Sequence, residues 1–182
     1  MTLAADVGRA LNALRDAAGL TLSELARRSG VGKATLSELE AGRRNPTLET
    51  LYALTTALRV PLSAVLQPPP GGTSSAISGV SVDAVLVTRF EAAAVTTEIY
   101  RMAIRPGPVQ HSAAHAPGTI EHLVVLAGTA VVGADGRSRP IRSGHSFTWP
   151  ADVPHSYAAK GSEQVDAVLV MTYRLIGPAA RE

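Results

Sequence analysis

Five basic side chains cluster in one short stretch of the chain: Arg27, Arg28, Lys33, Arg43 and Arg44. Lysine and arginine are the side chains that most often contact the phosphates and guanine edges of nucleic acids. The formal net charge of the whole chain is only +2, which would not by itself indicate such a partner. However, residues 1–66 hold 8 Lys and Arg against 6 Asp and Glu, whereas residues 67–182 hold 9 of each. The basic excess is therefore confined to one region, which favours a nucleic-acid-binding surface there.

The residues around this cluster predict a set of short helices. Thr21 followed by Glu24 is a capping box, and Gly30 is a typical helix end. A further helix is expected between Gly32 and Gly42, and another after Thr47. The apolar positions recur at helical spacing in four groups: Val7, Leu11, Leu14 and Ala18; Leu22, Leu25 and Ala26; Leu36 and Leu39; Leu48, Leu51, Leu54 and Leu58. We expect five short helices around one small core. An ordinary helical bundle would explain the periodicity, but not a polar outer face bracketed by basic residues.

The runs Leu22-Ser-Glu-Leu-Ala and Glu40-Ala-Gly-Arg-Arg-Asn-Pro-Thr-Leu-Glu-Thr-Leu51 carry a close resemblance to a known family. Over roughly residues 4–66 the chain resembles the XRE family of phage-repressor-like regulators, which implies a lambda-repressor-like helix-turn-helix domain bound to double-stranded DNA. The resemblance implies base-edge positions for Lys33, Ala34, Ser37 and Glu38, backbone contact for Thr35, phosphate contacts for Arg43 and Arg44, and DNA-binding positions for Thr21 and Ser23. Leu22 and Gly32 depart from the family pattern, where glutamine and serine are usual. For Glu38, a solvated helix-face charge is an equal alternative.

Composition narrows the class of protein. Hydrophobic residues make up 46% of the chain but aromatic residues only 4%, so the cores must be built from aliphatic side chains. The absence of cysteine excludes disulfides and thiolate metal sites. The N-terminal stretch is amphipathic and contains Asp6, unlike a signal peptide, and no apolar run approaches the roughly 20 residues of a membrane span. We therefore expect a cytoplasmic protein with no membrane partner.

A change of composition divides the chain. The proline- and glycine-rich stretch 67–76 predicts a linker between a helix-turn-helix domain, residues 1–66, and a second domain, residues 77–182. Strand-like, β-branched segments follow, with turn residues at intervals: residues 81–87, 95–104, 120–126, 130–132 and 165–176. This pattern predicts an antiparallel sandwich or barrel.

One spacing in the second domain carries chemistry. His115 and Glu121 are followed by Gly128, and later by Pro154 and His155. Over residues 77–176 this resembles the two motifs of the cupin family, whose double-stranded β-helix barrel points His, Glu and His into one pocket. The resemblance implies metal-ligand positions for His115, Glu121 and His155. It also implies a sensor role, since similar regulators use the barrel to bind a small-molecule effector.

The cupin pattern is incomplete, because Pro117 stands where a second motif histidine is usual. Two imidazoles and one carboxylate are still enough for one zinc, nickel, manganese or ferrous ion. A metal-free pocket lined by the same groups is the equal alternative. His111 is a candidate for the pocket mouth or for the missing ligand, and Trp149 and Tyr157 are candidates for the pocket wall. His122 is expected on the opposite face of its strand from Glu121.

Three functions follow from these resemblances. The first is a transcriptional regulator, not an enzyme, that binds an inverted-repeat operator as a homodimer and responds to a ligand in its barrel. The second is a mononuclear non-haem iron enzyme similar to hydroxypropylphosphonate epoxidase, with His115, Glu121 and His155 as iron ligands. Against it, the epoxidase pattern has its first histidine four residues before the glutamate, at Pro117. The third is an antitoxin-like interaction module with an inert barrel.

Overall fold

A computed structural model describes residues 2–66, 76–92 and 95–174. The chain divides into two compact units, Met1–Gly79 and Val80–Glu182, and each is described by itself. Apart from Ala76, the linker expected over residues 67–76 lies outside the described residues. No helix in the described part of the chain is long and apolar enough to cross a membrane.

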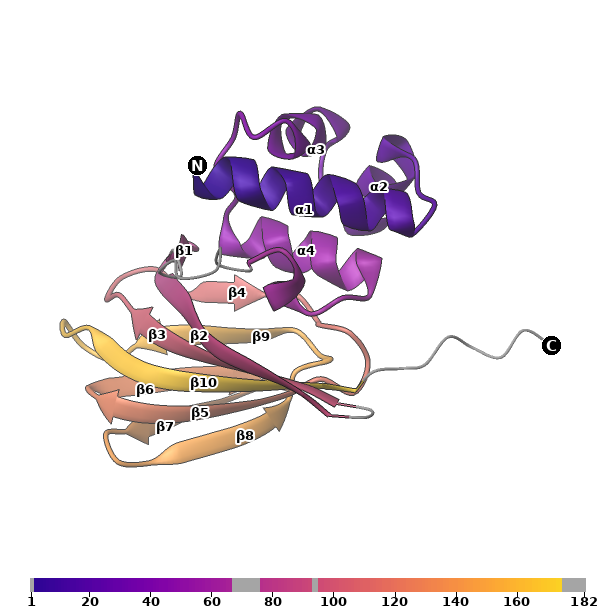
Figure 1. Ribbon diagram of the computed structural model, residues 1–182. Coiled ribbons are helices and arrows are strands. Elements are labelled where there is room, and N and C mark those ends of the chain that lie inside the picture. The colour runs from indigo at the N-terminus through magenta and orange to yellow at the C-terminus, as the bar shows by residue number, and fades with distance from the viewer. Residues whose placement is uncertain (1, 67–75, 93–94, 175–182) are drawn as a thin grey trace. The chain divides into compact units, whose positions relative to one another are not determined.

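The first unit is built from α1 (Leu3–Ala17), α2 (Leu22–Ser29), α3 (Lys33–Glu40) and α4 (Leu48–Leu58) (Figure 1). Threonine hydroxyls cap three of the four N-termini, and the capping box expected at Thr21 is confirmed, since its hydroxyl accepts the Glu24 amide at 3.1 Å. Gly30 ends α2 in the left-handed conformation, with φ of 69°. The apolar stripes meet in one core that contains Leu11, Leu25, Leu36, Leu39, Leu51 and Leu54.

The expectation of five helices is wrong for the described residues of this unit. Four α-helices form, and the only further helical segment is a single 3₁₀ turn at Leu62–Ala64. Pro61 begins that turn, and Pro68 follows shortly in the sequence. The six residues between the two prolines make fewer than two turns of α-helix, and Pro68 cannot donate the backbone hydrogen bond that would continue one.

Helix α1 makes an unusually close contact with the end of α3. A Cβ atom added at Gly8 would lie 2.4 Å from the carbonyl oxygen of Leu39 and 2.9 Å from that of Glu40. Both are backbone atoms and cannot move without moving α3. Glycine at this position therefore sets how closely the two helices approach.

The second unit is an antiparallel two-sheet structure. The larger sheet has the order β1-β2-β3-β10-β5-β8. Its strands within this unit are β2 (Val82–Ala92), β3 (Val95–Ile104), β5 (Ile120–Ala127), β8 (Ser146–Pro150) and β10 (Val165–Arg174), and the two-residue edge strand β1 (Ile77–Ser78) precedes Val80 in the chain. The smaller sheet has the order β4-β9-β6-β7 (Figure 1), with β4 (Gln110–Ser112), β6 (Thr129–Ala134), β7 (Arg137–Arg142) and β9 (His155–Ala159).

The expected closed barrel is not formed within the described residues. The strands form two separate sheets, and no hydrogen-bonded ladder joins a described strand of one sheet to a described strand of the other. Side chains connect the sheets instead: the Tyr157 hydroxyl on β9 reaches Glu121 on β5, and the Arg139 guanidinium on β7 lies 4.8 Å from the ring centre of Phe147 on β8. Burial alternates along β3 and β10, so every second side chain of these strands faces the space between the sheets.

Candidate nucleic-acid interface and metal centre

Helix α3 presents a polar face to solvent. Lys33, Ala34, Ser37 and Glu38 are all exposed, while Leu36 and Leu39 on the opposite side are 0% and 2% exposed. Thr35 is half-buried at the edge of this face. The helix is short, and its N-cap residue Gly32 offers no side chain to cap it. The structure thus brings the expected base-edge residues together on one side of a single helix.

Basic side chains flank this face just beyond the end of α3. Arg43 and Arg44 are both exposed. The Arg44 Nη1 atom lies 3.3 Å from Glu38 Oε2, and the two side chains are 55% and 48% exposed. Such an exposed pair contributes little to stability, so Arg44 is held only weakly by Glu38. This contact places Arg44 beside Glu38 at the exposed face of α3.

Helix α2 carries a second basic pair. Arg27 and Arg28 both contact Glu24, with nitrogen–oxygen distances of 2.7 Å. These hydrogen bonds, first that of Arg27 and then that of Arg28, lower the pKa of the Glu24 carboxyl to about 2. Thr21 and Ser23 are exposed at the start of the same helix, where the Thr21 hydroxyl is engaged as the helix cap.

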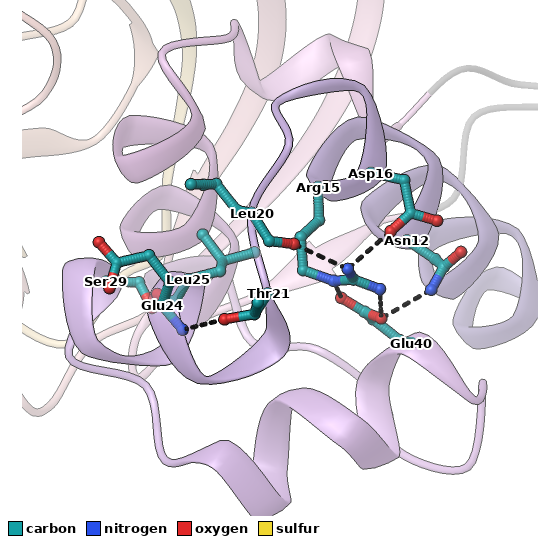
Figure 2. A network of polar contacts seen from close by, with 9 residues as sticks. All are labelled: Asn12, Arg15, Asp16, Leu20, Thr21, Glu24, Leu25, Ser29 and Glu40. Carbon is teal, nitrogen blue, oxygen red and sulfur yellow. Dashed lines mark hydrogen bonds and ion pairs between the residues drawn. The ribbon is translucent and has the colours of Figure 1, made fainter.

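A polar network that the sequence analysis missed fixes the end of α3 (Figure 2). Glu40 accepts hydrogen bonds from Arg15 Nε at 2.7 Å, Arg15 Nη2 at 2.9 Å and Asn12 Nδ2 at 2.8 Å. Burial raises the pKa of Glu40, but the Arg15 and Asn12 bonds outweigh it, so the pKa lies below its ordinary value. Arg15 also donates to the Leu20 carbonyl, in the turn before α2. The spacing of Asn12 and Arg15 on one face of α1 was the available signal, but nothing in the sequence paired that face with Glu40.

In the second unit, three candidate metal ligands converge between the sheets. His115 lies in the loop before β5, Glu121 on β5 and His155 at the start of β9, and their exposed fractions are 5%, 1% and 4%. One ligand atom from each lies within 4.8 Å of the others. The His115 loop is held in place because its backbone amide donates to the Ala151 carbonyl at 2.9 Å.

The electrostatics of this cluster centre on Glu121. Burial raises the pKa of its carboxyl, but the His115 hydrogen bond at 3.0 Å, both imidazoles and the Tyr157 hydroxyl outweigh this, and the pKa is lowered. Glu121 is therefore a buried carboxylate. The pKa of His155 is also lowered, first by burial, which disfavours the charged imidazolium.

The hydrogen bonds of His155 test whether a metal ion fits. Its Nδ1 donates to the Val153 carbonyl at 2.9 Å, so the lone pair of the neutral ring lies on Nε2. That Nε2 atom is buried, has no hydrogen-bond partner among the described residues, and lies 3.5 Å from Glu121 Oε2. A cation between these two electron-rich atoms would stabilise the arrangement. The donor set therefore fits a divalent metal ion.

The structure divides the remaining candidates. Tyr157 bonds to Glu121, and Trp149 is the register partner of Glu121 on β8, with its ring centre 6.2 Å from that of His155. Both belong to the wall of the cluster. His111 is exposed and does not contact Glu121, but with His155 it lines a cavity of about 350 Å³ along the smaller sheet. His122 is half-buried on the other face of β5, where it contacts Thr148.

Comparison with known proteins assigns a class to each unit. A helix-turn-helix family model matches residues 11–65, and a cupin domain model matches residues 100–172. Over 164 residues the chain is 32% identical to the HTH-type transcriptional regulator SutR of Escherichia coli (strain K12), which covers 90% of this chain and 92% of that protein.

Solved structures agree with this pattern. The crystal structure of an HTH_3 family transcriptional regulator from Vibrio cholerae has a TM-score of 0.83 and 26% identity, and the alignment covers 94% of this chain and 97% of that one. Hydroxypropylphosphonic acid epoxidase from S. wedmorenis aligns over 93% of this chain and 98% of its own, but with a TM-score of 0.43 and 16% identity. That likeness is too distant to support shared chemistry.

Proposed function

The chain belongs to the XRE-type helix-turn-helix transcriptional regulators that carry a cupin domain, and we propose that a metal ion in its cupin unit modulates its binding to DNA. His115, Glu121 and His155 would hold the ion, which would supply open coordination positions for water or for a small-molecule effector. Zinc, nickel, manganese and ferrous ions are the candidates for a site of two imidazoles and one carboxylate.

One observation carries the metal proposal: the buried lone pair of His155 Nε2 faces the Glu121 carboxylate without a hydrogen-bond partner among the described residues. His115 Nε2, which now donates to Glu121, would offer its lone pair to the ion in the tautomer that carries the ring proton on Nδ1. Because an ion is bound by neutral imidazoles and an ionised carboxylate, metal affinity should increase with pH. Tyr157 would keep its hydrogen bond to Glu121 and hold the carboxylate in place.

For DNA, we propose that α3 enters the major groove. Lys33, Ala34, Ser37 and Glu38 would lie at base edges, since they share its exposed face. Thr35, Thr21 and Ser23 would lie near the sugar–phosphate backbone, and Arg43 and Arg44 would bind phosphates. A homodimer would place two such helices one helical turn apart, about 34 Å, on an inverted-repeat operator.

The phosphate roles are testable through the salt dependence of binding. Each phosphate contact contributes about 0.9 to the slope of log affinity against log salt. Replacing Arg43 and Arg44 by alanine removes two phosphate contacts from each subunit, so it should reduce the slope by about 3.6 for a dimer on duplex DNA from the protein's own promoter. Arg59→Ala is the matched control, because it changes one exposed arginine beyond α4 and outside the proposed contacts. An unchanged slope in the double variant would refute the phosphate assignment.

The metal role needs a test with its own readout. We expect zinc, nickel, manganese or ferrous ion to raise the unfolding temperature of chelator-stripped protein, because a ligand at 100 times its Kd stabilises the folded state by about 2.7 kcal/mol. The ion should also change promoter affinity. Both effects should vanish in His155→Gln and persist in His122→Gln, a histidine on the outer face of the same unit.

Two results would contradict the proposal. If no ion stabilises the wild-type protein, the cupin unit is a metal-free pocket or an inert module. If an ion stabilises the protein but leaves promoter affinity unchanged, the site is structural and does not regulate.

A further inference from the structure

The cavity of about 350 Å³ along the smaller sheet has no role in the function proposed above. Residues of all four strands of that sheet line it, together with the turn between β6 and β7. Of the three candidate metal ligands, His155 borders the cavity, but His115 and Glu121 do not. Its volume lies near the lower end of the range of ligand pockets, roughly 300–1,000 Å³. The cavity is therefore large enough to hold a small metabolite.

One row of residues across these strands places the cavity on the outer face of the sheet. The row runs from β4 to β7 through His111, Ser156, Gly133 and Ser138. Tyr157, the next residue along β9, points between the sheets, because its hydroxyl contacts Glu121. Successive side chains of a strand point to opposite faces, so the row through Ser156 points outward. All four residues of this row line the cavity.

The polar side chains that line the cavity are available to a ligand. They are His111, Ser112, Arg137, Ser138 and Ser156. Within the described part of the chain, none of these side chains makes a hydrogen bond or an ion pair. None of the lining residues is acidic, and Asp135, in the turn between β6 and β7, does not line the cavity. One guanidinium, one imidazole and three hydroxyls can all donate hydrogen bonds to the oxygens of an anion.

Gly133 keeps the middle of the outward row open. Its φ is not positive, so its backbone conformation does not require glycine, and glycine within a strand lowers stability. A Cβ atom added here would lie 2.5 Å from Ser156 Oγ and 3.4 Å from Ser138 Oγ. Glycine inside a strand often marks a place where a ligand approaches the backbone closely. The missing side chain therefore leaves space between two serine hydroxyls.

We propose that this cavity binds a small anion that carries a phosphate or carboxylate group. The Arg137 guanidinium would bind two oxygens of that group side by side, a geometry that suits both phosphate and carboxylate. The hydroxyls of Ser138 and Ser156 would donate to it from the two sides of Gly133, and His111 would donate from β4. This site is additional to the proposed metal centre, and it does not depend on a bound metal ion.

The test is an NMR titration of the full-length, chelator-stripped protein, followed through the ring signals of its five histidines. Inorganic phosphate, glycerol 3-phosphate and succinate are the probes, and glycerol is the uncharged control. His111→Gln assigns the His111 signal. We expect at least one anion to shift that signal saturably, glycerol to leave it unchanged, and the signal of His122, on the larger sheet, to stay in place. The anion that saturates the shift at the lower concentration identifies the group that the cavity binds.

Variants locate the binding on the surface. Arg137→Ala should weaken binding at least about tenfold, because it removes hydrogen bonds from a charged donor. Arg142→Ala is the matched control, since it removes an exposed arginine from the same strand, outside the cavity. It should leave the Kd unchanged. Gly133→Ala should also weaken binding, because the new methyl group would occupy the space between the two serine hydroxyls.

The outcomes separate this inference from the proposed metal role. If no anion shifts the His111 signal, or if His122 shifts equally, the inference is overturned. An unchanged Kd in Arg137→Ala, or an equal loss in Arg142→Ala, would overturn it too. A saturable His111 shift that Arg137→Ala and Gly133→Ala weaken, and Arg142→Ala does not, would support it. Because the protein is stripped of metal, that result stands even if no ion stabilises the protein, which would refute only the metal proposal.

Discussion

Replacing Glu40 by glutamine should destabilise the helical unit and weaken DNA binding together. The Glu40 carboxylate accepts three hydrogen bonds, two from Arg15 and one from Asn12, and it fixes the end of α3 to α1. The side chains of Arg15 and Glu40 are only 12% and 8% exposed, so water cannot solvate the Arg15 guanidinium once the carboxylate is lost. Glutamine keeps the shape but removes the charge and one acceptor oxygen.

The size of the effect follows from this burial. Removing one partner of a buried ion pair costs about 3–5 kcal/mol. Arg15 would retain Asp16 and the Leu20 carbonyl, so we expect about 2–3 kcal/mol for Glu40→Gln. For a unit of this size, that lowers the unfolding temperature by roughly 10–20 °C. Glu38→Gln is the control, since its exposed pair with Arg44 should contribute less than about 1 kcal/mol.

The same variant has a defined pH dependence. Because the folded-state pKa of Glu40 lies below its ordinary value of 4.5, the wild-type advantage is complete above pH 4.5 and is lost as the pH falls through the folded-state pKa. The two proteins should therefore converge in acid. Thermal unfolding followed by circular dichroism from pH 7 to pH 3 measures this. A difference below about 0.5 kcal/mol at pH 7 would refute the argument from burial.

Three further predictions concern single residues of the helical unit. Gly8→Ala should destabilise this unit by about 1–3 kcal/mol in urea unfolding, because the new methyl group would collide with the Leu39 carbonyl. This overpacking outweighs the roughly 1 kcal/mol gain in helix propensity. Equal or greater stability of the variant would contradict the close approach of α1 to α3. Thr21→Ala should cost about 1 kcal/mol by the same measurement, through the lost cap, and Thr21→Ser should restore most of it. In a carboxyl-detected NMR titration, Glu24 should titrate near pH 2 and move toward its ordinary value of 4.5 in Arg27→Ala; titration at its ordinary value in the wild type would exclude the ion pair.

Local signals in the sequence located most of the helical unit correctly. Thr21, Gly30 and Thr47 mark helix ends in the structure as their types predict, because capping depends on neighbouring backbone atoms only. The contact of Gly8 with α3 and the pairing of Arg15 with Glu40 were not foreseen. Both join residues about 25 or more positions apart, and one sequence does not reveal which distant polar residues face each other.

In the second unit, alternation predicted the strands but not their assembly. The segment expected at residues 95–104 is β3 in full, because its β-branched alternation depends on the pleat alone. Glu98 also follows that alternation, and it is fully buried with a hydrogen bond from Tyr100 at 2.7 Å. Whether the sheets close into a barrel depends on pairing at their edges, which alternation does not encode. Likewise, the resemblance to the cupin motifs implied that His115, Glu121 and His155 converge, but not the contact with Val153 that sets the tautomer of His155.

The position of Trp149 makes the cupin unit observable by intrinsic fluorescence. It is the only tryptophan of the chain, and it stacks on Phe147 within 5.5 Å between ring centres while lying close to His155. Tryptophan fluorescence, excited selectively, therefore reports on the cupin unit and not on the helices. Quenching of this intrinsic fluorescence by a paramagnetic ion would measure occupancy of the site without a label.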